Sequence, residues 1–385
     1  MQKVFRQSVI AAGLILGAAA CTDEGEKSWP STTTTGGASS SSAASSSSSA
    51  SSSSGEAGAG GNGGSGGMAG AGVGGMGGAG GAGGNGGMGG AGGGGGGAPE
   101  NPMNLTVIIA GKDVKLDWVK SAKPTSRIVR KEGSAPTGPD DPSASVVYEG
   151  PGITTTEPLR NLLPTTPNVP RTYHYAVYGC DGTCGGDPAA DTLSPTIMQC
   201  LAGGGYNLFW RHASADVCSD NTGLGTAANT SYPDWWKRCD ANCPQGQPPT
   251  ATARQLNPTG NMESIAIGNS LATRGIPFGR MLSSEYCRCM KTAELMNLVP
   301  IASIEQNQDI TYYVYDEANR CNNTMALLAV EPPAGANTGL VSHGGFVCPT
   351  LGELAWAEAA IYKPNGMGGS TFIARVHWNA WDALP

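Results

Sequence analysis

The fold of the C-terminal part of this chain is decided by one stretch, Tyr206-Asn207-Leu208-Phe209-Trp210-Arg211-His212-Ala213. Its apolar run predicts a short buried strand. Arg211 and His212 follow that run at once, so both side chains are expected at the carboxyl end of the strand. Ligand sites of α/β folds lie at such strand ends. The stretch therefore predicts a functional pair at one edge of a sheet.

The segments that follow this strand alternate between helix and strand patterns. Apolar residues of 262–271 recur close to helical spacing, namely Met262, Ile265, Ala266, Ile267 and Leu271. Residues 280–284 and 339–343 are strand-like, and 287–294 has the character of a helix. The order strand, helix, strand, helix, strand predicts an α/β fold with a mainly parallel sheet flanked by helices.

Four short motifs occur in this region in a fixed order. They are Arg211-His212-Ala213, then Leu256 with Gly260, then Ser283-Ser284 with Arg288, Thr292 and Ala293, and finally His343-Gly344. Residues 358–364 and 371–376 add a closing hairpin. Together these motifs resemble the histidine phosphatase superfamily, to which the phosphoglycerate mutases belong. The resemblance covers 207–384, so 203–385 is expected to be a histidine phosphatase-like domain with the phosphoglycerate mutase-like fold.

The resemblance implies a phosphatase that works through a covalent intermediate. His212 is expected to attack phosphorus with an unprotonated ring nitrogen, and water then hydrolyses the phosphohistidine. Its other ring nitrogen needs an acceptor that fixes the tautomer. The phosphoryl oxygens are expected to be bound by Arg211, Arg288 and His343. Arginine suits this task because its planar group donates parallel hydrogen bonds to phosphate. Neither a metal nor another cofactor is expected.

Two features depart from the family's pattern. Glu285 stands where a proline is common after the serine pair, and it adds negative charge near the expected phosphate pocket. The proton donor for the leaving alcohol also has no match. Acidic residues in the relevant intervals are Asp216, Glu305, Asp309, Asp316 and Glu317. None of them lies in a motif of the family, so the general acid stays unassigned.

The insert at 213–253 is expected to form a lid over the site. Cys218 is expected to pair with Cys239 or with Cys243. The pair Trp235-Trp236 either lines the pocket or packs beneath the lid, and packing is favoured.

The N-terminus has the layout of a secretory signal peptide over residues 1–20. Lys3 and Arg6 give a positive start, an apolar stretch follows, and three alanines precede Cys21. These small residues resemble a bacterial lipoprotein signal, in which Cys21 becomes the lipidated first residue. The alternative is simple cleavage that leaves Cys21 a free thiol. We expect an exported protein that is lipid-anchored to the bacterial outer membrane or cell surface.

Export also accounts for the cysteine content. The chain has 11 cysteines, and an even number remains when Cys21 is counted separately. An even number in an oxidising compartment predicts disulfides. Cys180 and Cys184 either close a small loop, or one of them pairs with Cys200. Cysteines on both sides of Arg288 would stiffen that turn.

Two further segments precede the phosphatase-like part. Residues 21–99 are serine repeats followed by glycine-rich repeats, and they have too little to bury to offset their ordering entropy. We predict a disordered tether there. Residues 102–200 predict an all-β sandwich, with strands expected at 105–109, 114–118, 127–130, 146–148 and 172–178. Trp118, Leu162 and the run Tyr173-His174-Tyr175-Ala176-Val177-Tyr178 resemble the core of a fibronectin type III domain.

Two functions from different classes remain open. The first is an exported phosphomonoesterase that acts on a small phosphorylated substrate through His212. The second is a catalytically inactive, phosphatase-like lipoprotein that binds an anionic ligand or serves in adhesion. The formal net charge of −7 argues against sequence-independent nucleic-acid binding, which needs a positive surface. His174 and His377 are given no role, and the oligomeric state is not predicted.

Overall fold

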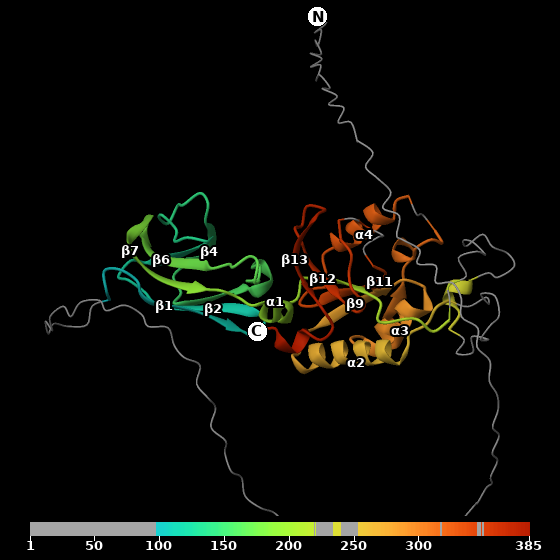
Figure 1. The fold of residues 1–385 in the computed structure, drawn as a ribbon. Helices are drawn as coiled ribbons and strands as arrows, with labels where there is room; N and C mark the ends of the chain where they lie inside the picture. The colour runs from blue at the N-terminus through green and yellow to red at the C-terminus, as the bar shows by residue number, and fades with distance from the viewer. Residues whose placement is uncertain are drawn as a thin grey trace, which may run out of the picture. The chain divides into compact units, whose positions relative to one another are not determined.

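The computed structural model describes residues 98–218, 220, 234–239, 253–315, 318–344, 348 and 350–385 (Figure 1). The expected signal peptide, nearly all of the expected tether and much of the insert after Ala213 lie outside these ranges. The described residues belong to one compact unit, Gly89–Pro385. Within this part of the chain, no helix has the length and apolar character needed to cross a membrane.

Seven strands of the first part form two antiparallel sheets, ordered β1-β2-β5 and β4-β3-β6-β7. Their bounds are β1 Met103–Ala110, β2 Asp113–Val119, β3 Thr125–Glu132, β4 Ser145–Gly150, β5 Thr154–Pro158, β6 Tyr173–Asp181 and β7 Thr183–Leu193. The segments expected from sequence lie in five of these strands. β5 and β7 were not expected, because their threonine, glycine, alanine and aspartate residues carry no alternating apolar pattern.

Apolar side chains of these strands are buried with a period of two. Val114, Leu116 and Trp118 of β2 are buried, and the residues between them are more exposed. Leu162 and Tyr175 are fully buried as well. Large buried side chains contribute most of the stabilisation of such a core. The aromatic and leucine positions singled out in the sequence therefore lie inside this part of the protein.

A disulfide joins Cys180 to Cys184 at the turn between β6 and β7. This confirms the small loop that the sequence offered as one alternative. Cys200 is a free, buried cysteine in helix α1 (Ile197–Gly203), so a pairing with Cys200 is wrong.

The second part is built on a six-stranded sheet with the order β10-β9-β11-β8-β12-β13. Neighbours among β10, β9, β11 and β8 run parallel, while β12 and β13 form an antiparallel edge. The bounds are β8 Asn207–Arg211, β9 Phe278–Ser283, β10 Ile304–Gln306, β11 Asn337–Ser342, β12 Ala359–Pro364 and β13 Ser370–Val376. The fold is therefore mixed α/β, and the expected closing hairpin is present as β12 and β13.

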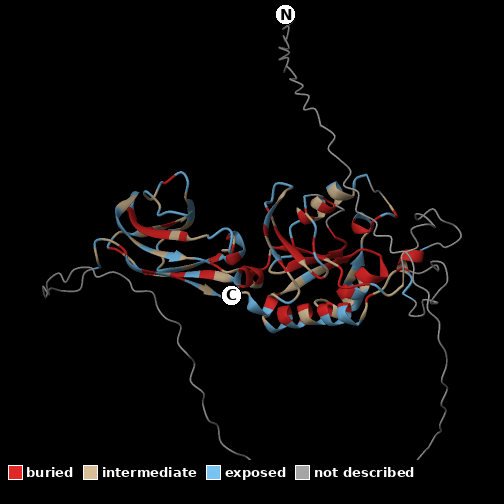
Figure 2. Ribbon diagram, in the orientation of Figure 1, coloured by how far each residue is buried: buried red, intermediate tan, exposed pale blue. Residues whose placement is uncertain are grey.

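Helices cover both faces of this sheet (Figure 1). They are α2 Pro258–Thr273, α3 Cys287–Met296 and α4 Arg320–Leu328. Side chains of β8 alternate between the two faces. Leu208 and Trp210 share a core with Ile267 of α2, whereas Phe209 belongs to a second core with Leu328 of α4. β11 is buried throughout, and β8 is buried except for the half-buried Arg211. Figure 2 shows the buried residues gathered along the strands of this sheet.

The buried face of α2 differs from the apolar stripe expected in the sequence. Met262 and Ile265 are 58% and 44% exposed, whereas Ile267 is buried. The close approach of α2 to α3 decides this face. A Cβ at Gly268 would lie 2.0 Å from the carbonyl oxygen of Met296, so the helices touch through backbone at this glycine. Met262 and Ile265 are then left on the outer face of α2.

The substitution Gly268→Ala tests this contact. Alanine favours an isolated helix over glycine, but here the added methyl group collides with backbone of α3. We expect a loss of about 1–3 kcal/mol in the free energy of unfolding, measured by urea denaturation. Gly138→Ala is the matched control, because no atom of the described residues lies within 4 Å of a Cβ at that position. A Gly268→Ala protein as stable as the wild type would contradict the packing described here.

Candidate active site

The candidate site lies where three neighbouring parallel strands end. His212 follows β8, Ser284 follows β9 and His343 follows β11. The register pairs Ser342 with Arg211 and Val341 with Ser283, so these ends lie side by side. The ring centroids of His212 and His343 are 5.3 Å apart. The topology thus brings together two histidines that are 131 positions apart in the sequence.

The ring of His212 is buried and held in one tautomer. Its Nδ1 lies 2.8 Å from the carbonyl oxygen of Ala213. A carbonyl oxygen only accepts, so Nδ1 carries the proton and Nε2 keeps its lone pair. Arg288 confirms this assignment, because its Nε donates to His212 Nε2 over 3.0 Å. The acceptor that the sequence argument required is therefore the backbone of the next residue.

Arg288 connects the groups of the site through its single planar guanidinium. Besides the hydrogen bond to His212, its Nη2 lies 3.2 Å from Nδ1 of His343. Its Nη1 forms an ion pair with Asp220 over 2.8 Å. The guanidinium carbon also lies 4.5 Å from the ring centroid of Tyr286. Arg288 is buried, so these contacts are shielded from solvent.

Both histidines are held in the neutral state. Burial lowers the pKa of His212 well below 6.5, and the positive charge of Arg288 lowers it further. The same two causes, in the same order, lower the pKa of His343. A neutral imidazole is the nucleophilic form. The site thus favours the neutral form of His212.

Thr292 holds the loop of His212 against the helix of Arg288. Its Oγ1 accepts from the backbone N–H of Ala213 over 3.1 Å and donates to the carbonyl of Arg288 over 2.8 Å. Glu263 of α2 fixes the next residue, Ser214, through its backbone N–H and its hydroxyl, each at 2.8 Å. The threonine of the sequence motif thus joins two segments that both carry site residues.

The loop also needs a glycine in α2. A Cβ at Gly260 would lie 2.1 Å from the carbonyl oxygen of Ser214. This close approach explains why the motif of Leu256 and Gly260 belongs with the histidine loop.

Arg211 lies at the site, but its side-chain hydrogen bond is to a backbone carbonyl and not to either histidine. Its Nη1 donates to the carbonyl of Leu354 over 2.7 Å, and its guanidinium lies 5.6 Å from the ring centroid of Trp356. Its buried Nε has no hydrogen-bond partner among the described residues. Burial lowers the pKa of Arg211, and the charges of Arg254 and Arg288 add to this effect. Arg211 is thus an electrostatic neighbour of the other arginines.

Arg254 is a site residue that the sequence analysis missed. Burial lowers its pKa, and the charge of Arg288 adds to this. Within the described part of the chain, its buried Nε has no hydrogen-bond partner. The sequence signal that could have identified Arg254 is its position, directly after the long insert and shortly before the motif that opens α2. Together Arg211, Arg254, Arg288, His212 and His343 form what we call the arginine–histidine cluster.

Two of the acidic residues considered as proton donors, Glu305 and Asp309, make their contacts away from this cluster. Glu305 forms an exposed ion pair with Arg280 over 2.8 Å. Asp309 is exposed and accepts from Asn323 over 3.2 Å. Asp216 is exposed as well, and Asp316 and Glu317 lie outside the described residues.

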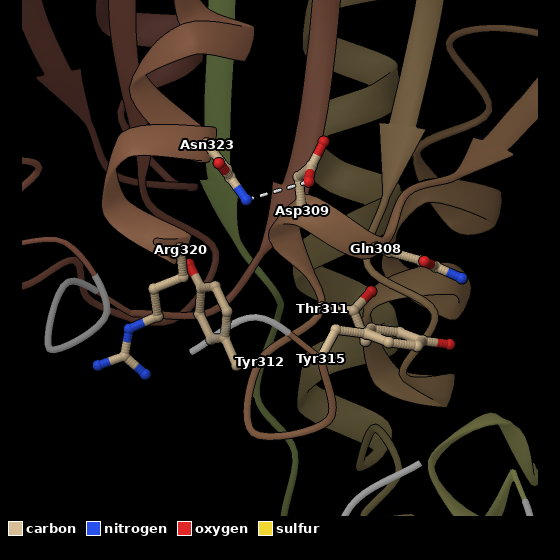
Figure 3. Close-up of a pocket in the computed structure, with 7 residues that line it drawn as sticks. All are labelled: Gln308, Asp309, Thr311, Tyr312, Tyr315, Arg320 and Asn323. Carbon is tan, nitrogen blue, oxygen red and sulfur yellow. Dashed lines mark hydrogen bonds between the residues drawn. The ribbon is translucent and has the colours of Figure 1, made fainter. Parts of the chain in front are cut away.

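Asp309 and Asn323 belong to a small cavity of about 140 Å³ near the second histidine (Figure 3). Its lining is Gln308, Asp309, Thr311, Tyr312, Tyr315, Arg320 and Asn323. The ring of Tyr312 is 4.6 Å from that of His343, between their centroids. The cavity therefore borders the arginine–histidine cluster on the side of His343.

Glu285 does not add a free charge to the phosphate pocket, contrary to expectation. Its carboxylate accepts from Trp236 Nε1 over 2.9 Å and from the Tyr315 hydroxyl over 2.6 Å. Lys237 Nζ lies 3.3 Å from the same carboxylate. Glu285 thus anchors the segment 234–239 of the insert. The neighbouring Trp235 and Trp236 are buried, which confirms packing over pocket lining.

One of the two alternatives expected for the disulfide of Cys218 is wrong. Cys239 pairs with Cys287, at the start of α3, so the alternative with Cys218 is wrong. Cys218 is itself disulfide-bonded, and Cys243 lies outside the described residues. One side of Arg288 is therefore braced as expected. On its other side Cys289 is a free thiol, and burial raises its pKa to about 12. An unexpected disulfide joins Cys321 to Cys348.

Histidine phosphatases are among the solved structures to which this chain is similar. The protein histidine phosphatase SixA complexed with tungstate shares 19% identity, with a TM-score of 0.30, over 45% of this chain and 97% of that one. A mutant phosphoserine phosphatase from Entamoeba histolytica in complex with phosphoserine shares 10%, with a TM-score of 0.25, over 44% and 95%.

A further similar structure is of a different kind. The FN5 domain of Drosophila Lar shares 12% identity, with a TM-score of 0.18, over 25% of this chain and 97% of that domain. The sequence matches no protein-family model and no curated protein.

The hydroxyl of Thr292 is expected to contribute measurably to stability. In Thr292→Val the shape is kept, but the buried N–H of Ala213 loses its acceptor, at a cost of about 1–3 kcal/mol. Thr292→Ser keeps the hydroxyl and is the control. Urea denaturation should find the valine protein clearly less stable than the serine protein, and equal free energies of unfolding would refute the role of this hydrogen bond.

The neutral histidines also predict how stability depends on pH. The native pKa of His212 lies below its ordinary value of 6.5. Its contribution is therefore fully present above pH 6.5 and is lost as pH falls from 6.5 towards the native pKa, because the unfolded chain binds the proton more readily.

The part of the pH dependence of the free energy of unfolding that is due to His212 can be isolated with His212→Asn. Below pH 6.5 and above the native pKa of His212, the wild type should lose up to about 1.4 kcal/mol per pH unit more than this variant. Denaturation at several pH values measures both slopes, and identical slopes would mean that His212 titrates normally in the folded protein.

Proposed function

We propose that this protein is an exported, lipid-anchored phosphatase that hydrolyses phosphomonoesters through a phosphohistidine on His212. The observation that carries the proposal is the state of the imidazole. Its Nδ1–H donates to the carbonyl of Ala213, and its Nε2 accepts a hydrogen bond from Nε of Arg288, a donor that a phosphoryl oxygen would take over. A neutral, oriented imidazole beside fixed positive charge is the arrangement that nucleophilic attack on a phosphoryl group requires.

The arginines would bind and stabilise the phosphoryl group. Arg288 lies against both histidines, and the buried Nε groups of Arg211 and Arg254 have no hydrogen-bond partner in the described part of the protein. Charge on the transferred group is spread over its equatorial oxygens, so donors placed around it lower the barrier. We assign phosphate binding to Arg211, Arg254 and Arg288, with His343 as a fourth ligand. The reaction proposed here uses no metal ion.

The remaining parts of the chain would place this head outside the cell. We propose a signal over 1–20, lipidation at Cys21 and a flexible tether over 21–99. The antiparallel strands of 102–200 would serve as a fibronectin type III-like spacer, and 203–385 as the phosphatase domain. A tether after a lipid anchor lets the domain reach substrates away from the membrane.

The proposal is tested with the full-length protein and p-nitrophenyl phosphate. Turnover should persist in EDTA and fall at least about a thousandfold in His212→Asn, because the nucleophile is lost. His377→Asn is the matched control, since that histidine bonds Asn379 at the end of the hairpin. Binding of phosphate without turnover would instead favour the inactive, anion-binding lipoprotein. Wild-type turnover in His212→Asn would refute the proposal.

A further inference from the structure

Asp220 lies against the arginine that holds the nucleophile. Its Oδ1 is 2.8 Å from Nη1 of Arg288 and accepts the backbone N–H of Arg254 over 2.9 Å. Its side chain is 18% exposed. One rigid guanidinium therefore orients both the imidazole of His212, through Nε, and the carboxylate of Asp220, through Nη1.

Other carboxylates near the site are already engaged. Glu263 accepts both donors of Ser214, and Glu285 accepts from Trp236 and Tyr315. Among the carboxylates of the described residues, Asp220 alone forms an ion pair with an arginine of the cluster. Both contacts that Asp220 makes with other described residues are through Oδ1, and we take Oδ2 as the oxygen that would face a ligand.

We propose that Asp220 is the proton donor to the leaving oxygen and the proton acceptor in the second step. The inference rests on the phosphatase activity proposed above. A phosphoryl group bound among the arginines competes with Asp220 for Nη1 of Arg288. Two anions in one partly buried site repel each other, and a proton on the carboxyl group removes that repulsion. The proposal therefore places the proton that the first step needs on Asp220 in the substrate complex.

The two proposed steps account for every bond and every proton. In the first, Nε of Arg288 transfers its hydrogen bond from Nε2 of His212 to a phosphoryl oxygen, and the freed Nε2 bonds to phosphorus. The bond from phosphorus to the ester oxygen breaks, and that oxygen takes the proton of Asp220. In the second, Asp220 takes a proton from water while the water oxygen bonds to phosphorus and the bond to Nε2 breaks. Phosphate leaves, and Asp220 again carries a proton. A single residue serves as acid and then as base.

The test compares two esters in Asp220→Asn of the full-length protein. p-Nitrophenolate is stable enough to leave without being protonated, whereas an alkoxide needs a proton to leave. We expect kcat/KM for an alkyl phosphate to fall about 10²–10⁴-fold more than kcat/KM for p-nitrophenyl phosphate. The ratio of the two esters cancels any change in phosphate affinity, since that change is common to both. Asp216→Asn, an exposed carboxylate on the same segment, is the matched control and should leave the ratio unchanged.

A second readout keeps this test separate from that of the phosphatase itself. Asp220→Asn should still form phosphohistidine from p-nitrophenyl phosphate and should accumulate it, because water is no longer activated. Equal effects on both esters, or a rise in both rates, would overturn the role of Asp220 while leaving the phosphohistidine proposal intact. A wild-type protein that forms no phosphohistidine would overturn the phosphatase proposal itself.

Discussion

The hydrogen bond from Nδ1–H of His212 to the carbonyl of Ala213 decides what this site can do. It fixes the tautomer, and it leaves the Nε2 lone pair directed at Arg288. Burial and neighbouring positive charge keep the ring neutral by lowering its pKa. An exposed histidine would lack both constraints, because it would titrate near neutral pH and rotate freely.

The rest of the α/β part supports this one hydrogen bond. Parallel strands bring His212 and His343 to the same edge of the sheet, and Thr292 joins the histidine loop to α3. The insert is anchored to the same helix by the disulfide from Cys239 to Cys287, next to Arg288. The position of Arg288 therefore depends on sheet topology, helix packing and the insert together.

Local sequence patterns predicted the elements that short stretches of the chain determine by themselves. The strand ending in Arg211-His212 and the helix beginning at Cys287 are both present. Features that depend on distant partners were not predictable. Cys239 pairs with a cysteine 48 positions away, and the buried face of α2 follows from backbone contact at Gly268. Asp220 has no motif around it, and only the folded chain brings it to Arg288.

The central claim is that Nε2 of His212 forms the bond to phosphorus. The most direct measurement is the location of the phosphoryl group on the protein after brief exposure to substrate and an alkaline quench, by mass spectrometry of peptides and ³¹P NMR. The account predicts a single phosphorylated residue, His212, modified at Nε2. Phosphate on Nδ1, on another residue, or on none during turnover would contradict it.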